Sequence, residues 1–188
     1  MTKLFLDTEF SGLHQKTTLI SIGIVSETGE TFYCELDDYD ETQCDKWIKD
    51  NVIAKLKHKR PLVFMPTPIP NDRKISDYPD GAEQYPYSRI NHYNSQEDSI
   101  AGFSIDMMGD MDNLKDELTE WLAQFKKIEI WSDTYAYDWV LFCEIFGHAF
   151  KVPEQVDYIP FDLSTLFKVK GIDPDVSRED YAKNTLNN

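Results

Sequence analysis

Short apolar segments separated by polar turns follow one another along the chain, and their spacing predicts strands in the first part. Residues 3–9 are mostly apolar up to two acids and predict a buried strand. Residues 17–27 are β-branched and mostly apolar, and residues 31–36 follow the turn signal Thr28-Gly29. This pattern predicts a central strand and a partner strand that form a hairpin.

Helical periodicity begins after the hairpin. Apolar residues near a period of 3.6 predict helices, with Thr42 as the N-cap of the first and Asp112 or Asn113 as the N-cap of the second. Gly147 is expected just past the end of the third. In chain order, the elements predicted after the hairpin are helix 42–56, helix 113–125, strand 127–133, helix 136–147 and a weaker helix 162–169. This order predicts an α/β fold in which helices flank a mixed sheet, made of an antiparallel meander plus parallel strands.

The character of the chain changes in its middle. Of the nine prolines, six lie between Pro61 and Pro86, and residues 66–99 are polar and rich in tyrosine without a helical period. We therefore expect an irregular insertion at about residues 61–110 within a single domain over residues 1–188. The stretch "DMMGDMDN", residues 106–113, departs from the pattern of an EF-hand calcium loop.

Composition narrows the function classes. No apolar run approaches the ~20 residues that cross a membrane, and the acids that begin at Asp7 are unlike a signal peptide. The three scattered cysteines indicate reduced thiols in a cytoplasmic protein rather than a disulfide framework or a zinc site. The net charge of −15 opposes long-range attraction to nucleic acid, so a nucleic-acid enzyme of this charge needs local help from metal ions or basic side chains.

One basic run stands out in this acidic chain. Residues 55–60, "KLKHKR", follow the apolar stripe of the first predicted helix. Two interpretations are open: local help for nucleic-acid binding, and a basic helix C-terminus that complements the helix dipole. The second is the simpler one, and we take it as the expectation.

Two acids close together at the end of the first strand raise a chemical question. In a strand, residues i and i+2 point to the same face, so Asp7 and Glu9 are expected side by side. Two such carboxylates repel each other, and a divalent cation such as Mg²⁺ between them would offset that repulsion. The alternative is a strand that ends at the surface with two solvated acids.

Two segments of the chain carry a family resemblance. The segment "DTEFSGL", residues 7–13, has the pattern D-x-E-x-S/T-G-L, and in "WSDTYAYDWVLF", residues 131–142, Asp138 follows an aromatic residue at a predicted helix start. In this order they resemble the first and second motifs of the DEDD-type 3′–5′ exonucleases, which include ribonuclease T, oligoribonuclease and polymerase proofreading domains. With "LISIG" at 19–23, the pattern is most similar to the small mycobacterial-type 3′–5′ exoribonucleases.

The resemblance implies a ribonuclease H-like fold and a two-metal site for Mg²⁺ or Mn²⁺, in which two ions clamp the scissile phosphate of RNA or of a single-stranded 3′ end. It implies that Asp7, Glu9 and Asp138 bind metal and carry catalysis. It also implies that the backbone of Thr8 and Phe10 contacts the terminal nucleotide, and that Leu13 wedges against the terminal base. The alternatives are an acid favoured at a helix N-terminus for Asp138 and ordinary turn packing for Leu13.

The chain departs from the family at the third motif. In the histidine-type branch, H-x-A-L-x-D supplies a general-base His and the fourth carboxylate. Aligned by the leucine, "KNTLNN" places Lys183 at the His position and Asn188 at the Asp position. A lysine is a poor base near neutral pH, and an amide is a weaker metal ligand than a carboxylate. An incomplete C-terminus, a degenerate nuclease and a base from elsewhere all account for this departure.

The sequence therefore supports a metal-dependent 3′–5′ exonuclease as the first hypothesis. The alternative is a degenerate nuclease-fold module that binds nucleotides or a protein partner without efficient catalysis. A D-x-D phosphatase is disfavoured because position 9 is Glu and no phosphate-cradling loop follows. Relatives with short sheets often pair, so a homodimer that completes the site stays open, as does the choice between RNA and DNA.

Overall fold

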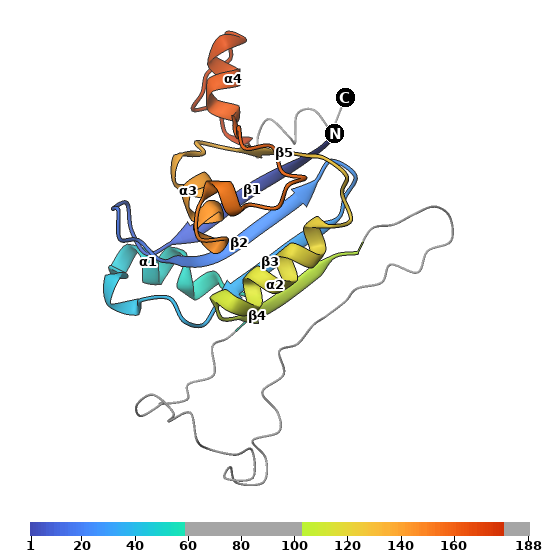
Figure 1. The fold of residues 1–188 in the computed structure, drawn as a ribbon. Helices are drawn as coiled ribbons and strands as arrows, with labels where there is room; N and C mark the ends of the chain where they lie inside the picture. The colour runs from blue at the N-terminus through green and yellow to red at the C-terminus, as the bar shows by residue number, and fades with distance from the viewer. Residues whose placement is uncertain (59–102, 179–188) are drawn as a thin grey trace.

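The computed structural model describes residues 1–58 and 103–178, which form a mixed six-stranded sheet with helices against it (Figure 1). The strand order is β4-β3-β2-β1-β5-β6. This architecture confirms the predicted α/β class and is consistent with a ribonuclease H-like fold. None of the helices in these ranges is long and apolar enough to cross a membrane.

The first three strands form the expected antiparallel meander. Strand β1 spans Thr2–Phe10, β2 spans Leu19–Ser26 and β3 spans Thr31–Leu36. Gly29 sits in the turn between β2 and β3 at a φ of 105°, a conformation that glycine adopts at little steric cost. The predicted hairpin is therefore confirmed.

The other strands join the meander in parallel. Strand β4 (Ile105–Gly109) pairs with β3. Strand β5 (Ile128–Ser132) pairs with β1, and strand β6 (Phe161–Asp162) pairs with β5. Between them run helix α2, Met111–Leu122, and helix α3, Ala136–Ile145, whereas α4, Leu163–Val169, follows β6. In Figure 1, α2 and α3 lie on the same side of the sheet, and α4 extends away from it.

The two faces of the sheet have different surroundings. One face packs against α2 and α3 and forms the core, which includes the fully buried Trp121 and Phe142. The alternation along β1 leaves the other face open at Phe5, Asp7 and Glu9. The prediction of a buried strand over residues 3–9 is therefore wrong for these three side chains, which none of the helices in the described ranges covers.

The helix predicted over residues 42–56 is broken. The structure has a short 3-10 turn at Glu41–Gln43, helix α1 at Lys46–Asn51 and a second 3-10 turn at Ile53–Lys55. Asp45 caps α1 by accepting a hydrogen bond from the Ile48 N–H, so Thr42 is not the N-cap. Asp40 accepts from Thr42 and starts the earlier turn, and these local side-chain bonds compete with a continuous helix.

The region before α2 also differs from the prediction. Residues 105–109, assigned to the insertion, form β4, in which buried residues alternate with half-buried ones as in a strand. Helix α2 begins earlier than expected, with Asp110 as N-cap. Asp110 accepts from the Asn113 N–H at 2.8 Å, and Asn113 accepts from the Asp110 N–H at 3.3 Å, which forms a capping box.

The last predicted elements are confirmed. Strand β5, helix α3 and helix α4 occupy the expected positions, and Gly147 follows α3 with a φ of 91°. Lys183, Asn188 and most of the predicted insertion, including His92, lie outside the described residues.

Candidate active site

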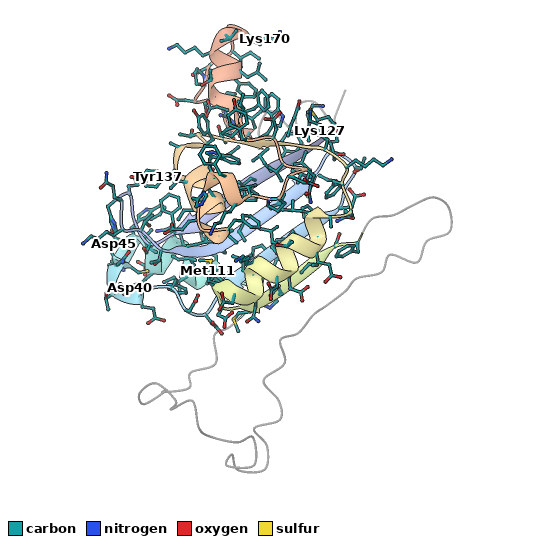
Figure 2. All side chains as sticks on the ribbon, in the orientation of Figure 1. Asp40, Asp45, Met111, Lys127, Tyr137 and Lys170 are labelled. Carbon is teal, nitrogen blue, oxygen red and sulfur yellow. The ribbon has the colours of Figure 1, made fainter. Side chains whose placement is uncertain are left out.

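The candidate site lies where two neighbouring parallel strands end. The last register pair of β1 and β5 is Leu6 with Ser132, and beyond it β1 continues through Asp7 and Glu9, paired with β2 on its other edge. Because β1 and β5 are parallel, both point their carboxyl ends to the same edge, where α3 also begins. Figure 2 shows Tyr137 in the first turn of α3, far from Lys127, which precedes the start of β5.

Asp138 occupies the place that a longer β5 would have filled. It is 6% exposed, and its Oδ1 accepts hydrogen bonds from the Thr8 N–H at 3.2 Å and the Thr8 hydroxyl at 2.6 Å. Its Oδ2 accepts from the Ser132 hydroxyl. The buried Asp138 carboxylate therefore joins α3 to β1, and the N–H of Thr8 is engaged in this contact.

The turn that brings Asp138 to Thr8 contains an unusual residue. Thr134, between β5 and α3, has a φ of 65°, a conformation that β-branched residues rarely adopt. Such backbone strain occurs preferentially at functional sites, where the surrounding contacts hold it. Here it allows only three residues, 133–135, to connect β5 with α3.

Asp7 and Glu9 point to the open face, opposite to the Thr8 side chain, and both are exposed. Partial desolvation raises the pKa of Asp7, and the negative charges of Asp138 and Asp133 raise it further. Desolvation likewise raises the pKa of Glu9, with added repulsion from Asp7 and Asp138, whereas Lys55 opposes the shift. Asp138 thus acts electrostatically on both, although its hydrogen bonds go to Thr8 and Ser132.

Asp133 belongs to this carboxylate group and was not predicted. It directly follows β5 and accepts hydrogen bonds from Arg178 and Ser164, each at 2.7 Å. Although partial burial raises the pKa of Asp133, these hydrogen bonds hold it below its usual range. Nothing in the sequence marked it, because its proximity to Asp7 depends on β5 lying beside β1.

The loop after β1 presents Leu13. The Ser11 hydroxyl accepts from the Thr18 N–H at 2.8 Å and donates to the Gln43 side chain at 2.7 Å, which fixes the base of the loop. Leu13 at its tip is 79% exposed, so ordinary turn packing does not account for it. Beside β1, the Phe10 ring stacks on Tyr137 with centroids 5.1 Å apart.

Comparisons with known proteins identify the family of this chain. The family described as the 3′-5′ exoribonuclease Rv2179c-like domain matches residues 2–187. The chain belongs to this family. Two curated relatives from Mycobacterium tuberculosis, the 3′-5′ exoribonucleases Rv2179c (strain H37Rv) and MT2234.1 (strain CDC 1551), are each 24% identical over 171 residues. The match covers 90% of this chain and 76% of each relative.

Membership of the Rv2179c-like family confirms the resemblance drawn from "DTEFSGL" and "AYD". The roles of individual residues remain predictions, and the donor chemistry bears on them. Asp7 and Glu9 supply the carboxylate oxygens that Mg²⁺ and Mn²⁺ prefer, so the residues fit such an ion. Within residues 1–58 and 103–178, no group of three His, Cys, Asp or Glu side chains is arranged to hold a metal.

None of the histidines in these ranges takes the place of a third-motif base. His14 is exposed, and His148 caps a 3-10 turn, Ala149–Lys151, by accepting from the Phe150 N–H. His58 is half-buried, and its Nε2 lies 2.7 Å from the Asp106 carboxylate. It belongs to a polar cluster on the open face, away from the end of β1.

Proposed function

We propose that this protein is a metal-dependent 3′–5′ exoribonuclease that hydrolyses the terminal phosphodiester bond of single-stranded RNA. The observation that carries the proposal is that Asp7 and Glu9 lie side by side on the open face of β1, where desolvation raises both pKa values and the negative charge of Asp138 raises them further. Family membership supports the reaction class.

In this proposal Asp7 and Glu9 hold the metal, and Asp138 adds a third negative charge at the end of β1. When bound, two divalent ions supply an activated water and stabilise the leaving 3′-oxygen. The Thr8 and Ser132 hydroxyls donate hydrogen bonds to Asp138, and these bonds fix α3 against β1.

The side chains around the carboxylates orient the 3′ end. The exposed Leu13 contacts the terminal base, and the stacked Phe10–Tyr137 pair offers an aromatic wall beside it. Stacking and apolar contact of this kind tolerate any base, as an enzyme that degrades RNA stepwise requires. The backbone of Phe10 continues the contact to the terminal ribose.

The test is degradation of 5′-labelled single-stranded RNA with Mn²⁺ or Mg²⁺. We expect a ladder that shortens from the 3′ end, no products in EDTA, and a loss of at least about 10²-fold in rate for Asp7→Asn, since the charge that holds the ion is removed. Asp116→Asn on the exposed side of α2 is the matched control and keeps the wild-type rate. Products from internal cleavage, or hydrolysis that persists in Asp7→Asn, contradict the proposal.

A second candidate is a degenerate module that binds RNA or nucleotides without efficient hydrolysis. It is favoured by the absence of a three-ligand group among the described residues and by Lys183 and Asn188 at the third-motif positions. The same assay separates the two, because the module would bind the labelled RNA and leave it intact with either metal.

A further inference from the structure

Residues 57 and 58 of the basic run lie against the open face of the sheet. The buried Glu35 of β3 accepts hydrogen bonds from the backbone N–H groups of Lys57 at 2.6 Å and His58 at 2.9 Å. The Tyr33 hydroxyl donates to the same carboxylate at 2.6 Å. Three bonds to one buried acceptor fix the path of the chain at Lys57, so the position of this side chain is set by the fold.

The ammonium group of Lys57 has a defined place. Its Nζ lies 4.6 Å from the centre of the Tyr33 ring and 3.3 Å from Oδ2 of Asp106. The Lys57 side chain is 62% exposed, so its charge stays available to a ligand. A partly exposed ion pair of this kind contributes at most about 1 kcal/mol to stability, so the pair alone does not explain the arrangement.

Sheet register connects Lys57 to the carboxylates. Asp7 pairs with Gly23, and Gly23 pairs with Tyr33, so the three share one row on the open face. Two strand spacings, about 10 Å, separate Asp7 from Tyr33. Gly23 leaves the space between them free, since a Cβ there would meet only the Tyr33 ring, at 3.9 Å.

The open row is part of a groove of about 530 Å³, a volume in the range of small-ligand sites. Its lining includes Phe5, Asp7, Trp131 and Asp133, together with Lys57 over the Tyr33 ring. Among the described residues that line it, Lys57 is the single cation. The positive charge of Lys55, on the same run, partly offsets the rise in the pKa of Glu9.

From this arrangement we infer that Lys57 binds a backbone phosphate of the RNA strand upstream of the scissile bond. The inference rests on the proposed function, which places the scissile phosphate at Asp7. A single strand that leaves Asp7 along the groove passes over Gly23 and reaches the Lys57 ammonium. In a chain of net charge −15, this cation supplies the local attraction that the molecule as a whole lacks.

The test measures equilibrium binding of a short labelled single-stranded RNA in EDTA, which prevents hydrolysis, over a range of salt concentrations. For Lys57→Gln we expect affinity about five-fold lower at 0.1 M salt, and a salt dependence reduced by about 0.7 in the log–log slope, as one lost phosphate contact predicts. Lys57→Arg keeps the charge and retains both values. Lys46→Gln, on the exposed surface of α1, leaves both unchanged.

A variant of Asp106 separates phosphate binding from a structural pair. If Lys57 binds phosphate, Asp106→Asn frees the ammonium and strengthens RNA binding, whereas Lys57→Gln weakens it. If the two variants weaken binding alike, or if Lys57→Gln leaves the slope at the wild-type value, the inference is wrong. It is also wrong if the wild-type chain binds no RNA. If the protein binds RNA but does not hydrolyse it, the result contradicts the proposed function alone. The RNA affinities of the wild type and Lys57→Gln then still test the inference.

Discussion

At the scale of single residues, the unusual feature is the end of β1, where two carboxylates lower the stability of the folded protein. Asp7 and Glu9 lie on one face, where desolvation and neighbouring carboxylates raise both pKa values. A group whose pKa is raised on folding binds its proton more tightly in the folded state, so its ionisation at neutral pH opposes folding. A bound cation would offset this loss of stability, as expected at a cation-binding site.

We therefore expect Asp7→Asn to raise the stability of the metal-free protein, by an amount that depends on pH. At low pH both states of the wild type are protonated, so the variant has no advantage. As pH rises from the ordinary value of 3.8 through the raised folded-state pKa, the wild type loses stability and the variant does not. Above that range we expect the variant to melt roughly 1–3 °C higher, as judged by thermal unfolding in EDTA.

With millimolar Mn²⁺ at neutral pH, we expect the wild type to melt at a higher temperature than Asp7→Asn. Binding to the folded state alone adds about 2.7 kcal/mol at one hundred times the dissociation constant, and Asp7→Asn forfeits that gain. Asp116→Asn, an exposed acid of α2, serves as the control and follows the wild type throughout. An advantage of Asp7→Asn that is the same at acid and neutral pH would contradict the assignment to carboxylate repulsion.

At the scale of elements, local signals identified the strands better than the helix boundaries. The alternating and β-branched segments of β1, β2 and β3 follow directly from side-chain period, and sheet pairing kept them intact. The helix over residues 42–56 failed because Asp40 and Asp45 each bond to a nearby N–H and start separate turns. Strand β4 was missed because its pattern is short and precedes an acid-rich helix start.

The N-terminus of α2 allows a direct measurement. The Asp110 carboxylate accepts from the Asn113 N–H, and the Asn113 side chain accepts in return, so two otherwise unpaired donors are satisfied. We expect Asp110→Ala to lower the free energy of unfolding by about 1 kcal/mol, measured by urea denaturation. Asp110→Asn preserves a side-chain acceptor and should cost much less. Equal losses in the two variants would show that the cap does not stabilise α2.

At the scale of the whole molecule, the site is an outcome of topology. The motifs around Asp7 and Asp138 were visible in the sequence, and the family match confirms the family that they indicated. Asp133 was not found, because it comes near Asp7 only through the order β1-β5 in the sheet. Lys57 lies in the run 55–60 that was considered for nucleic-acid binding, but the sequence alone favoured a helix end. The basic run at residues 55–58 looked like a helix end, yet the sheet face beneath it gives Lys57 a place in the groove.

The third motif sets the last expectation for the molecule. Positions 183 and 188 carry Lys and Asn where the histidine-type branch has a general base and a fourth carboxylate. General-base catalysis is typically worth 10²–10⁴-fold, so we expect slow hydrolysis by this chain even at saturating Mn²⁺. The double substitution Lys183→His with Asn188→Asp should raise the single-turnover rate on 5′-labelled RNA by about 10²-fold or more. Lys170→His, at the end of α4, controls for an added imidazole and should change nothing. If the double variant is no faster than the wild type, these positions do not stand in for the third motif, and the proton of the attacking water must leave through another group.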